Sequence, residues 1–182
     1  MKPSLLLGVS LLLGAAAWGV DRPSQSAALA LVFPGAELTR REVFLTDAQL
    51  EQARSVSNVE VKTKYVVVYE ARKGTELLGV ALFDTHVVRT APETVMVAIS
   101  PAGVVLRVEV VQFREPEDYA APERWTKQLV GQTLSPKLSL KGDIKPLSGA
   151  SLTAQSMVDA SRRALGLFQV LHLAGATEGG HP

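Results

Sequence analysis

The chain has 182 residues, of which 47% are hydrophobic and 20% charged, a composition that suits one domain with a sizeable core. Its 19 Lys and Arg residues nearly balance its 18 Asp and Glu residues, and it has no polybasic arm, which argues against nucleic acid as a partner. The absence of cysteine excludes a disulfide framework, a cysteine-linked lipid and iron-sulfur or other cysteine-ligated metal sites.

Residues 1–19 have the pattern of a signal peptide. Lys2 supplies a positive start, residues 5–16 are apolar, and Ala15 to Ala17 offers a small-residue cleavage site. The apolar run is shorter than the roughly 20 residues that span a bilayer, so we predict cleavage, with retention as an anchor as the alternative. We therefore expect an exported protein.

Residues 20–57 predict an N-terminal helical segment. The apolar run 24–33 is followed by Pro and Gly, which end a helix. Thr46 and Gln49 have the spacing of a capping box, and so a second helix should begin at Asp47 and fade near Arg54.

Four strands are predicted in the next part of the chain, at 59–70, 77–88, 95–100 and 104–113. Glycine-containing turns join the first two and the last two, so we expect an antiparallel sheet of two successive hairpins. Consecutive apolar residues within these strands indicate that parts of the sheet are covered on both faces.

Helical patterns return after the strands. Pro122 and Gly131 bound a short helix whose Trp125 we expect in the core. Apolar residues at three- and four-residue steps over 154–171 predict a C-terminal amphipathic helix. The fold class is therefore α+β, and residues 174–182 read as a flexible tail.

A stretch of small and hydroxyl residues precedes the C-terminal helix, namely Ser148, Gly149, Ala150, Ser151, Leu152 and Thr153. The free N–H groups of a helix start and the positive end of its dipole favour a phosphate at such a place. The alternative is a simple turn with an N-cap, because Ser and Gly are also favoured there.

This stretch resembles the Ser/Thr-Gly-Ala-Thr signature of FMN-binding domains, which occur in the C subunit of sodium-pumping NADH:quinone reductases, the G subunit of Rnf-type complexes and small exported one-domain proteins. The resemblance implies an FMN-binding domain over 58–173 and FMN as cofactor. It also implies that Ser151 accepts FMN through a phosphoester made by a flavin transferase. The family usually has Asp six residues before the acceptor, where this chain has Lys145.

The resemblance extends to residues that would lie near the flavin ring. Glu115-Pro116 matches part of the family's Glu-Thr-Pro-Gly motif, although Glu115 alone is equally well read as a solvated strand-end charge. Thr85, His86 and Arg89 are candidates for hydrogen bonds to the ring. Tyr69 or Phe83 could form an apolar wall, and a purely local role for His86 is the alternative.

No nucleophile-base pair, dinucleotide fingerprint or metal-spaced set of ligands emerges from the sequence, so we assign no catalytic or metal-binding residue. The resemblance implies an electron carrier in the periplasm or on the outer face of the inner membrane, with membrane or envelope redox proteins as partners. Two alternatives stay open. One is a flavin-free assembly module of a membrane redox complex, and the other is a flavin-dependent reductase of a small acceptor.

Overall fold

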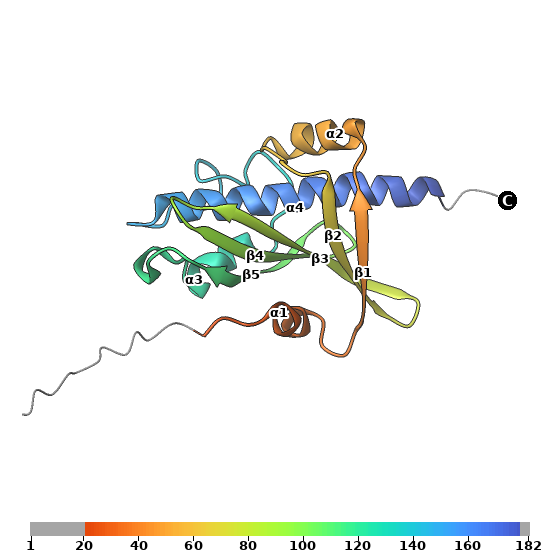
Figure 1. Ribbon diagram of the computed structural model, residues 1–182, viewed down its shortest axis with the longest axis horizontal. Coiled ribbons are helices and arrows are strands. Elements are labelled where there is room, and N and C mark those ends of the chain that lie inside the picture. The colour runs from red at the N-terminus through yellow and green to blue at the C-terminus, as the bar shows by residue number, and fades with distance from the viewer. Residues whose placement is uncertain (1–20, 179–182) are drawn as a thin grey trace, which may run out of the picture.

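The computed structural model describes residues 21–178, with side chains as far as Leu171 (Figure 1). One antiparallel sheet forms its centre, and the strands follow one another in chain order across it. These strands are β1 (Glu37–Phe44), β2 (Tyr65–Lys73), β3 (Glu76–Val87), β4 (Pro92–Ile99) and β5 (Val105–Phe113). The predicted signal peptide lies outside the described residues.

Helices cover both faces of this sheet (Figure 1). The main ones are α1 (Gln25–Val32), α2 (Asp47–Ser57) and α4 (Ser151–Glu178). α1 packs on β4 and β5 from one side, while α4 runs along β3, β4 and β5 on the other, with α2 packed against it. Three short turns lead from β5 toward α4, namely η1 (Glu117–Tyr119), α3 (Glu123–Thr126) and η2 (Lys127–Leu129). Within the described residues, no helix combines the length and hydropathy needed to cross a membrane.

Two apolar clusters hold the layers together. The larger lies between the sheet and α4, where Met157 and Leu165 are buried against strand residues such as Val95. The smaller lies under α1 and includes Leu29 and Met96. Val95 and Met96 are neighbours on β4 that belong to different clusters, because successive strand residues point to opposite faces. Both faces of β4 are therefore buried.

A glycine and an arginine fix α2 and the loop before α4 onto the long helix. A Cβ added at Gly166 would lie 2.8 Å from the Cβ of Ser57, so only glycine allows this close approach of α4 to α2. Arg162 donates hydrogen bonds to the carbonyl oxygens of Ser57 at 2.7 Å, Ser135 at 2.7 Å and Leu138 at 3.0 Å. Three segments far apart in the sequence are thus joined by one guanidinium group.

The α+β prediction, the two hairpins and the main helices are confirmed. Ser24 caps α1 by accepting from Ala27 N–H at 3.2 Å. The predicted capping box of α2 is formed in both directions, since Gln49 N–H donates to the Thr46 hydroxyl at 3.2 Å and Thr46 N–H donates to the Gln49 side chain at 2.9 Å.

Several predicted boundaries are wrong. The sheet has a fifth strand, β1, inside the segment 20–57 that was expected to be helical, and β2 begins at Tyr65 instead of at residue 59. α2 continues to Ser57, beyond the predicted end near Arg54. α4 begins three residues earlier than predicted, so that Ser151 to Thr153 form its first turn. Its backbone is helical to Glu178, and residues 179–182 of the predicted tail lie outside the described part.

β2 and β3 separate at one end. Their pairing runs from Lys73↔Glu76 to Val68↔Leu82 and stops there. Beyond it, β2 stays paired with β1 down to Tyr65, while β3 stays paired with β4 as far as Val87. The sheet therefore opens into a cleft between β2 and β3, on the side of the molecule where α4 begins.

Candidate functional site

The turn before α4 is open and its hydroxyl groups are accessible. Gly149 has a φ of +79°, a left-handed conformation that favours glycine, and Ala150 N–H closes the turn by donating to Leu147 C=O at 3.1 Å. Ser148 and Ser151 are exposed, and neither hydroxyl is hydrogen-bonded to another described residue. Both hydroxyls are thus available to a ligand.

The first turn of α4 presents free N–H groups beside these hydroxyls. The first helical bond runs from Ala154 N–H to Ala150 C=O at 3.0 Å, so the N–H groups of residues 151–153 have no helical acceptor. The positive end of the helix dipole reinforces them, and together they favour a phosphate. Leu152 is 54% exposed and Ala150 is buried, which leaves the outer side of the turn uncovered.

Thr153 differs from the other members of the predicted phosphate loop, residues 148–153. Its side chain is buried, and its hydroxyl donates to Tyr119 C=O at 2.7 Å. This bond fixes the start of α4 against η1, the turn that follows Pro116. Among the hydroxyl groups of the loop, Ser148 and Ser151 are therefore free for a ligand, whereas the Thr153 hydroxyl is used within the protein.

Glu115 is buried and organises the turn between β3 and β4. One carboxylate oxygen accepts hydrogen bonds from the N–H groups of Arg89 at 3.0 Å, Thr90 at 2.5 Å and Ala91 at 2.7 Å. The bonds from Thr90 and Ala91 are the main cause of a lowered pKa for Glu115. The reading of this residue as a solvated strand-end charge is wrong, because its side chain is buried and one carboxylate oxygen accepts three N–H groups of the turn.

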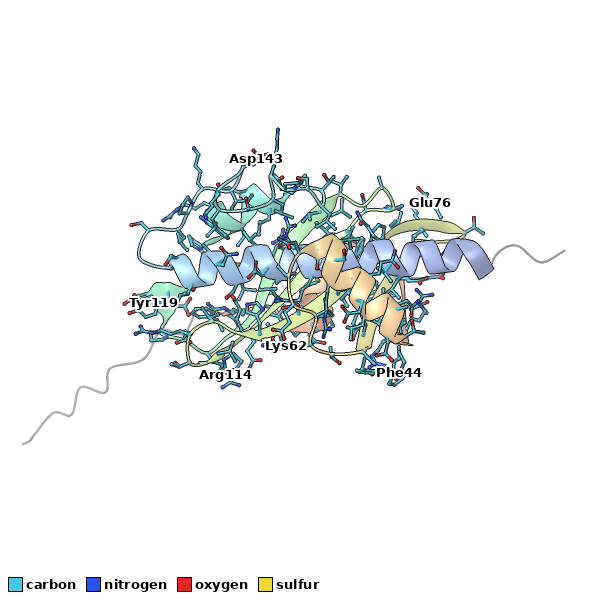
Figure 2. The ribbon with its side chains drawn as sticks, turned by 90° about the horizontal axis from the view of Figure 1, so that it is seen from above. Phe44, Lys62, Glu76, Arg114, Tyr119 and Asp143 are labelled. Carbon is cyan, nitrogen blue, oxygen red and sulfur yellow. The ribbon has the colours of Figure 1, made fainter. Side chains whose placement is uncertain are left out.

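These bonds bring the predicted residues to one end of the molecule. Figure 2 shows Tyr119 at the end where α4 begins. Pro116 is exposed between Glu115, which holds the β3–β4 turn, and Tyr119, which holds the α4 start. The structure thus assembles residues 115–116 and 148–153 around the same end of α4, although more than 30 residues separate them in the sequence.

Lys145 has an exposed side chain and a fixed backbone. Its N–H donates to the Gln128 side chain at 3.0 Å, and its carbonyl accepts from the indole N–H of Trp125 at 2.8 Å. Trp125 is buried in the larger core cluster, as predicted. Since the backbone bonds of Lys145 do not depend on its side chain, another residue type at this position would leave the loop path unchanged.

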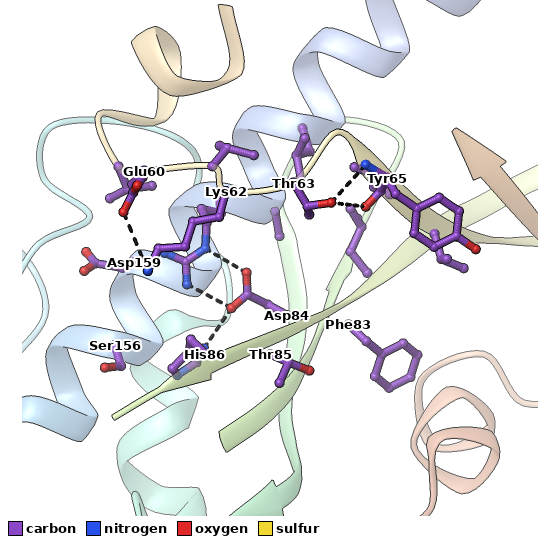
Figure 3. A pocket seen from close by; sticks show the side chains of 18 of the residues that line it. Glu60, Lys62, Thr63, Tyr65, Phe83, Asp84, Thr85, His86, Ser156 and Asp159 are labelled. Carbon is purple, nitrogen blue, oxygen red and sulfur yellow. Dashed lines mark hydrogen bonds and ion pairs between the residues drawn. The ribbon is translucent and has the colours of Figure 1, made fainter. Parts of the chain in front are cut away.

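The cleft between β2 and β3 is the second part of the site (Figure 3). It encloses about 1030 Å³ and is lined by both strands, by the segment 58–63 and by α4 from Ser156 onward. Ser156 follows Ser151 by five residues, a rise of about 7.5 Å along the helix. The open end of the sheet therefore lies next to the turn that presents Ser151.

A charged group of four side chains, which we call the histidine cluster, borders this cleft. It consists of Asp84, His86, Glu93 and Arg163. His86 Nδ1 lies 2.8 Å from Asp84 and Nε2 lies 3.0 Å from Glu93, so both ring nitrogens face carboxylates and both must carry protons. Arg163 binds Asp84 through two hydrogen bonds of 2.8 Å, which join α4 to β3.

The pKa values of the histidine cluster follow from these contacts. Burial alone would lower the pKa of His86, but the hydrogen bonds to Asp84 and Glu93 outweigh it and raise the pKa to about 9. Burial would raise the pKa of Asp84, but the hydrogen bonds from Arg163 and His86 outweigh it and hold that pKa well below its usual value. His86 is therefore an imidazolium ion at neutral pH.

Glu93 is fully buried, and its Oε1 has no hydrogen-bond partner. Its Oε2 is the acceptor for His86. Within the described residues, no group of three or more His, Asp or Glu side chains is arranged to hold a metal ion. The histidine cluster therefore contains one acceptor atom, Glu93 Oε1, that no described residue fills.

The residues that the sequence suggests for contact with the flavin ring lie in two places, the cleft and the β3–β4 turn. The rings of Tyr69 and Phe83 pack edge to face with centroids 5.5 Å apart, and both line the cleft with Thr85 and His86. The Thr85 hydroxyl lies 2.9 Å from that of Thr94. Arg89 does not line the cleft; it lies in the turn held by Glu115.

Sequence reasoning missed Glu93 and Arg163. A signal existed for Glu93, because a hairpin with this turn places it directly opposite His86. No local pattern indicates Arg163, which pairs with Asp84 across 79 residues. The polar run in β3 was noticed in the sequence, but its partners depend on the tertiary fold.

Residues 90–166 match the FMN-binding domain family, which confirms the resemblance seen in the sequence. The matched segment contains both Glu115-Pro116 and the phosphate loop, and it indicates FMN as the cofactor. The fold is similar to the crystal structure of NqrC from Shewanella oneidensis, with a TM-score of 0.55 and 14% identity over 81% of this chain and 87% of that one. At this identity the similarity concerns the fold alone. No curated protein gives a significant match.

Proposed function

We propose that this chain is an exported electron-transfer protein that carries FMN, with the FMN phosphate linked to Ser151. One observation carries the proposal: the segment that matches FMN-binding domains contains an exposed serine on the first turn of α4, with free N–H groups beside it. When bound, FMN supplies one- and two-electron transfer.

The side chains present suit this cofactor. The hydroxyls of Ser148 and Ser151 and the N–H groups of residues 151–153 provide the donors that a phosphate or phosphoester needs. Gly149 has no atom within 4 Å of the place where a Cβ would stand, so the approach to the turn is open. Serine forms the same ester as threonine, because both have a hydroxyl group.

The residues for the isoalloxazine ring would come from the neighbouring end of the cleft. Ser156 and His86 border the cleft there, and Pro116 is exposed on the adjoining turn. The ring nitrogens of His86 already face Asp84 and Glu93, so His86 would line the ring site without a free donor. Glu115 would act through the β3–β4 turn, whose position it sets. A direct contact of Glu115 with the ring stays a prediction.

Partners follow from the same proposal. The resemblance of the phosphate loop to FMN-binding domains of membrane redox complexes supports membrane or envelope redox proteins as donors and acceptors for this chain. Export rests on the pattern of residues 1–19. A flavin transferase in the same compartment would form the ester.

The test is the intact mass of the full chain expressed with a flavin transferase and directed for export. We expect a gain equal to FMN less one water, fluorescence that survives denaturation, and a mass that also reports removal of the leader. Ser151→Ala should abolish the bound mass, while Ser148→Ala, the matched control, should keep it.

Other outcomes would lead to different conclusions. A yellow protein that loses its flavin on denaturation would show that FMN is bound without a covalent ester. A colourless wild type that captures envelope redox proteins would favour the flavin-free assembly module, for which Lys145 in place of Asp is the supporting feature. Steady turnover of one small acceptor with a dissolved donor would favour the reductase.

A further inference from the structure

β1 forms the edge of the sheet, and no strand in residues 21–178 pairs with its outer side. In an antiparallel pair, the N–H and C=O groups of alternate residues point toward the partner. The bond from Leu45 N–H to Lys64 C=O, at 2.8 Å, shows that odd-numbered residues of β1 face β2. The backbone groups that point outward therefore belong to Leu38, Arg40, Glu42 and Phe44.

The same strand is accessible from both faces. Seven of its eight side chains are exposed, and Phe44 is the most exposed large apolar residue at 73%. Figure 2 shows Phe44 at the periphery of the molecule, beside the start of α2. Phe44 packs against Tyr65, with ring centroids 5.1 Å apart, and Leu38 is 41% exposed farther along β1. An eight-residue edge with this much exposed apolar surface can accept another strand.

We propose that the partner is a second copy of this chain, paired antiparallel through β1 about a two-fold axis at Arg41. In this register, Arg40 of each copy lies opposite Glu42 of the other, and Leu38 lies opposite Phe44. Each of these two pairings occurs twice by symmetry, and all of the residues involved have outward-pointing backbone groups. The register that allows backbone hydrogen bonds is therefore also the one that matches the side chains. The two sheets join into one.

Neighbouring symmetric registers are disfavoured. An axis at Arg40 would place that guanidinium against its own copy, and an axis at Glu42 would place two carboxylates together; like charges directly opposite each other are destabilising. An axis at Arg41 also places two arginines opposite each other on the other face of the strand, but it adds two Arg40–Glu42 pairs that the other two registers lack. On that other face each Arg41 already has Glu70 of its own chain at 3.3 Å.

Side chains already positioned on β1 fit the proposed contact. Arg40 is hydrogen-bonded to Glu42 of its own strand and to the Tyr65 hydroxyl at 3.2 Å. Both groups have further hydrogen-bonding positions, so two copies would form a ring of alternating charges. A single strand pair buries less than the ~1,200 Å² of typical stable interfaces, and we therefore expect a weak, concentration-dependent dimer.

The absence of cysteine in the chain provides a direct test of the register. At the two-fold axis, Arg41 of one copy faces Arg41 of the other in a non-hydrogen-bonded pair, with Cα atoms about 4.5 Å apart, a distance that a disulfide can span. Arg41→Cys should form a disulfide-linked dimer under mild oxidation at least tenfold faster than Thr39→Cys. In the matched control the two cysteines would be about 14 Å apart.

Sedimentation of unlinked protein provides a second, independent test. Arg40→Glu should weaken self-association at least tenfold, and Arg40→Glu with Glu42→Arg should restore it to within about twofold, because the swap keeps the opposite charges facing each other. Equal disulfide rates in the two cysteine variants would overturn the register. A wild type that stays monomeric at all concentrations, or a dimer unaffected by the charge reversal, would overturn the interface itself. None of these results depends on flavin.

Discussion

The phosphate loop leads into α4 and the histidine cluster joins α4 to β3 and β4, but the two regions have opposite characters. Ser148 and Ser151 are exposed and leave their hydrogen-bonding groups free, whereas Asp84, His86 and Arg163 are mostly buried and satisfy one another. A hydrogen-bonding group that is unpaired within the protein can bind a ligand without breaking an existing hydrogen bond. A group that is already paired contributes to stability and to the local electric field. We therefore expect substitutions in the histidine cluster to change mainly the free energy of unfolding, and substitutions of the free hydroxyls in the phosphate loop to change mainly flavin attachment.

The largest stability effect should come from Asp84→Asn. This change removes the carboxylate that pairs with Arg163 and one of the two carboxylates that pair with His86, so we expect the free energy of unfolding to fall by about 3 kcal/mol. Urea unfolding would measure it, and the fraction of chains carrying covalent flavin should stay unchanged. A loss of flavin with no loss of stability would reverse the roles assigned to the two regions.

His86→Gln should reveal a pH-dependent contribution. The pKa of His86 is raised above its unfolded value of about 6.5, so its stabilising effect is complete below that pH and disappears as the pH rises through about 9. The stability advantage of the wild type over His86→Gln should therefore shrink by about 3 kcal/mol between pH 6 and pH 10. A constant difference over this range would show that His86 is not held as an imidazolium ion.

Thr153→Val tests the residue of the phosphate loop whose hydroxyl is already hydrogen-bonded within the protein. Loss of the hydrogen bond to Tyr119 should lower the free energy of unfolding by about 1 kcal/mol. The flavin attachment that we propose at Ser151 should persist, because the valine variant removes no free hydroxyl from the turn. If Thr153→Val abolished flavin attachment and Ser151→Ala did not, Thr153 would be the acceptor.

Lys145→Asp should have the smallest effect on stability, less than about 0.5 kcal/mol, because the side chain is exposed and the backbone bonds remain. It should nevertheless raise the yield of covalent flavin, since it restores the residue that FMN-binding domains usually have there. Mass spectrometry of chains made with limiting transferase would measure that yield. An unchanged yield would mean that Lys145 does not limit recognition.

Local patterns were sufficient to predict much of the fold. The capping box of α2, the hairpins and the apolar repeat of α4 depend on residues close together in the sequence, and all were recovered. β1 was missed because its side chains are exposed on both faces, so it lacks the alternation that identifies a half-buried strand. Residues 59–64 were assigned to the first arm of the predicted hairpin, whereas the chain uses them as a loop before β2.

The candidate site was predictable only where its chemistry lies in one short segment. Residues 148–153 form such a segment, and the family match contains them. The role of Glu115 depends on N–H groups 24 to 26 residues away, and that of Asp84 depends on Arg163, 79 residues away. The sequence around a carboxylate does not show which distant donors will contact it in the fold. The burial and pairing of Glu115 and Asp84 could therefore be seen only in the structure.

The order of the strands has a consequence for how the chain folds. Because each strand pairs only with its neighbours in the sequence, the sheet requires few distant contacts and can form early. α4 must then dock onto a surface that already exists, and the serine turn reaches its final shape only at that step. In pulsed hydrogen exchange during refolding, amides of the β4–β5 hairpin should be protected before those of α4. Simultaneous protection would mean that the helix helps to nucleate the sheet.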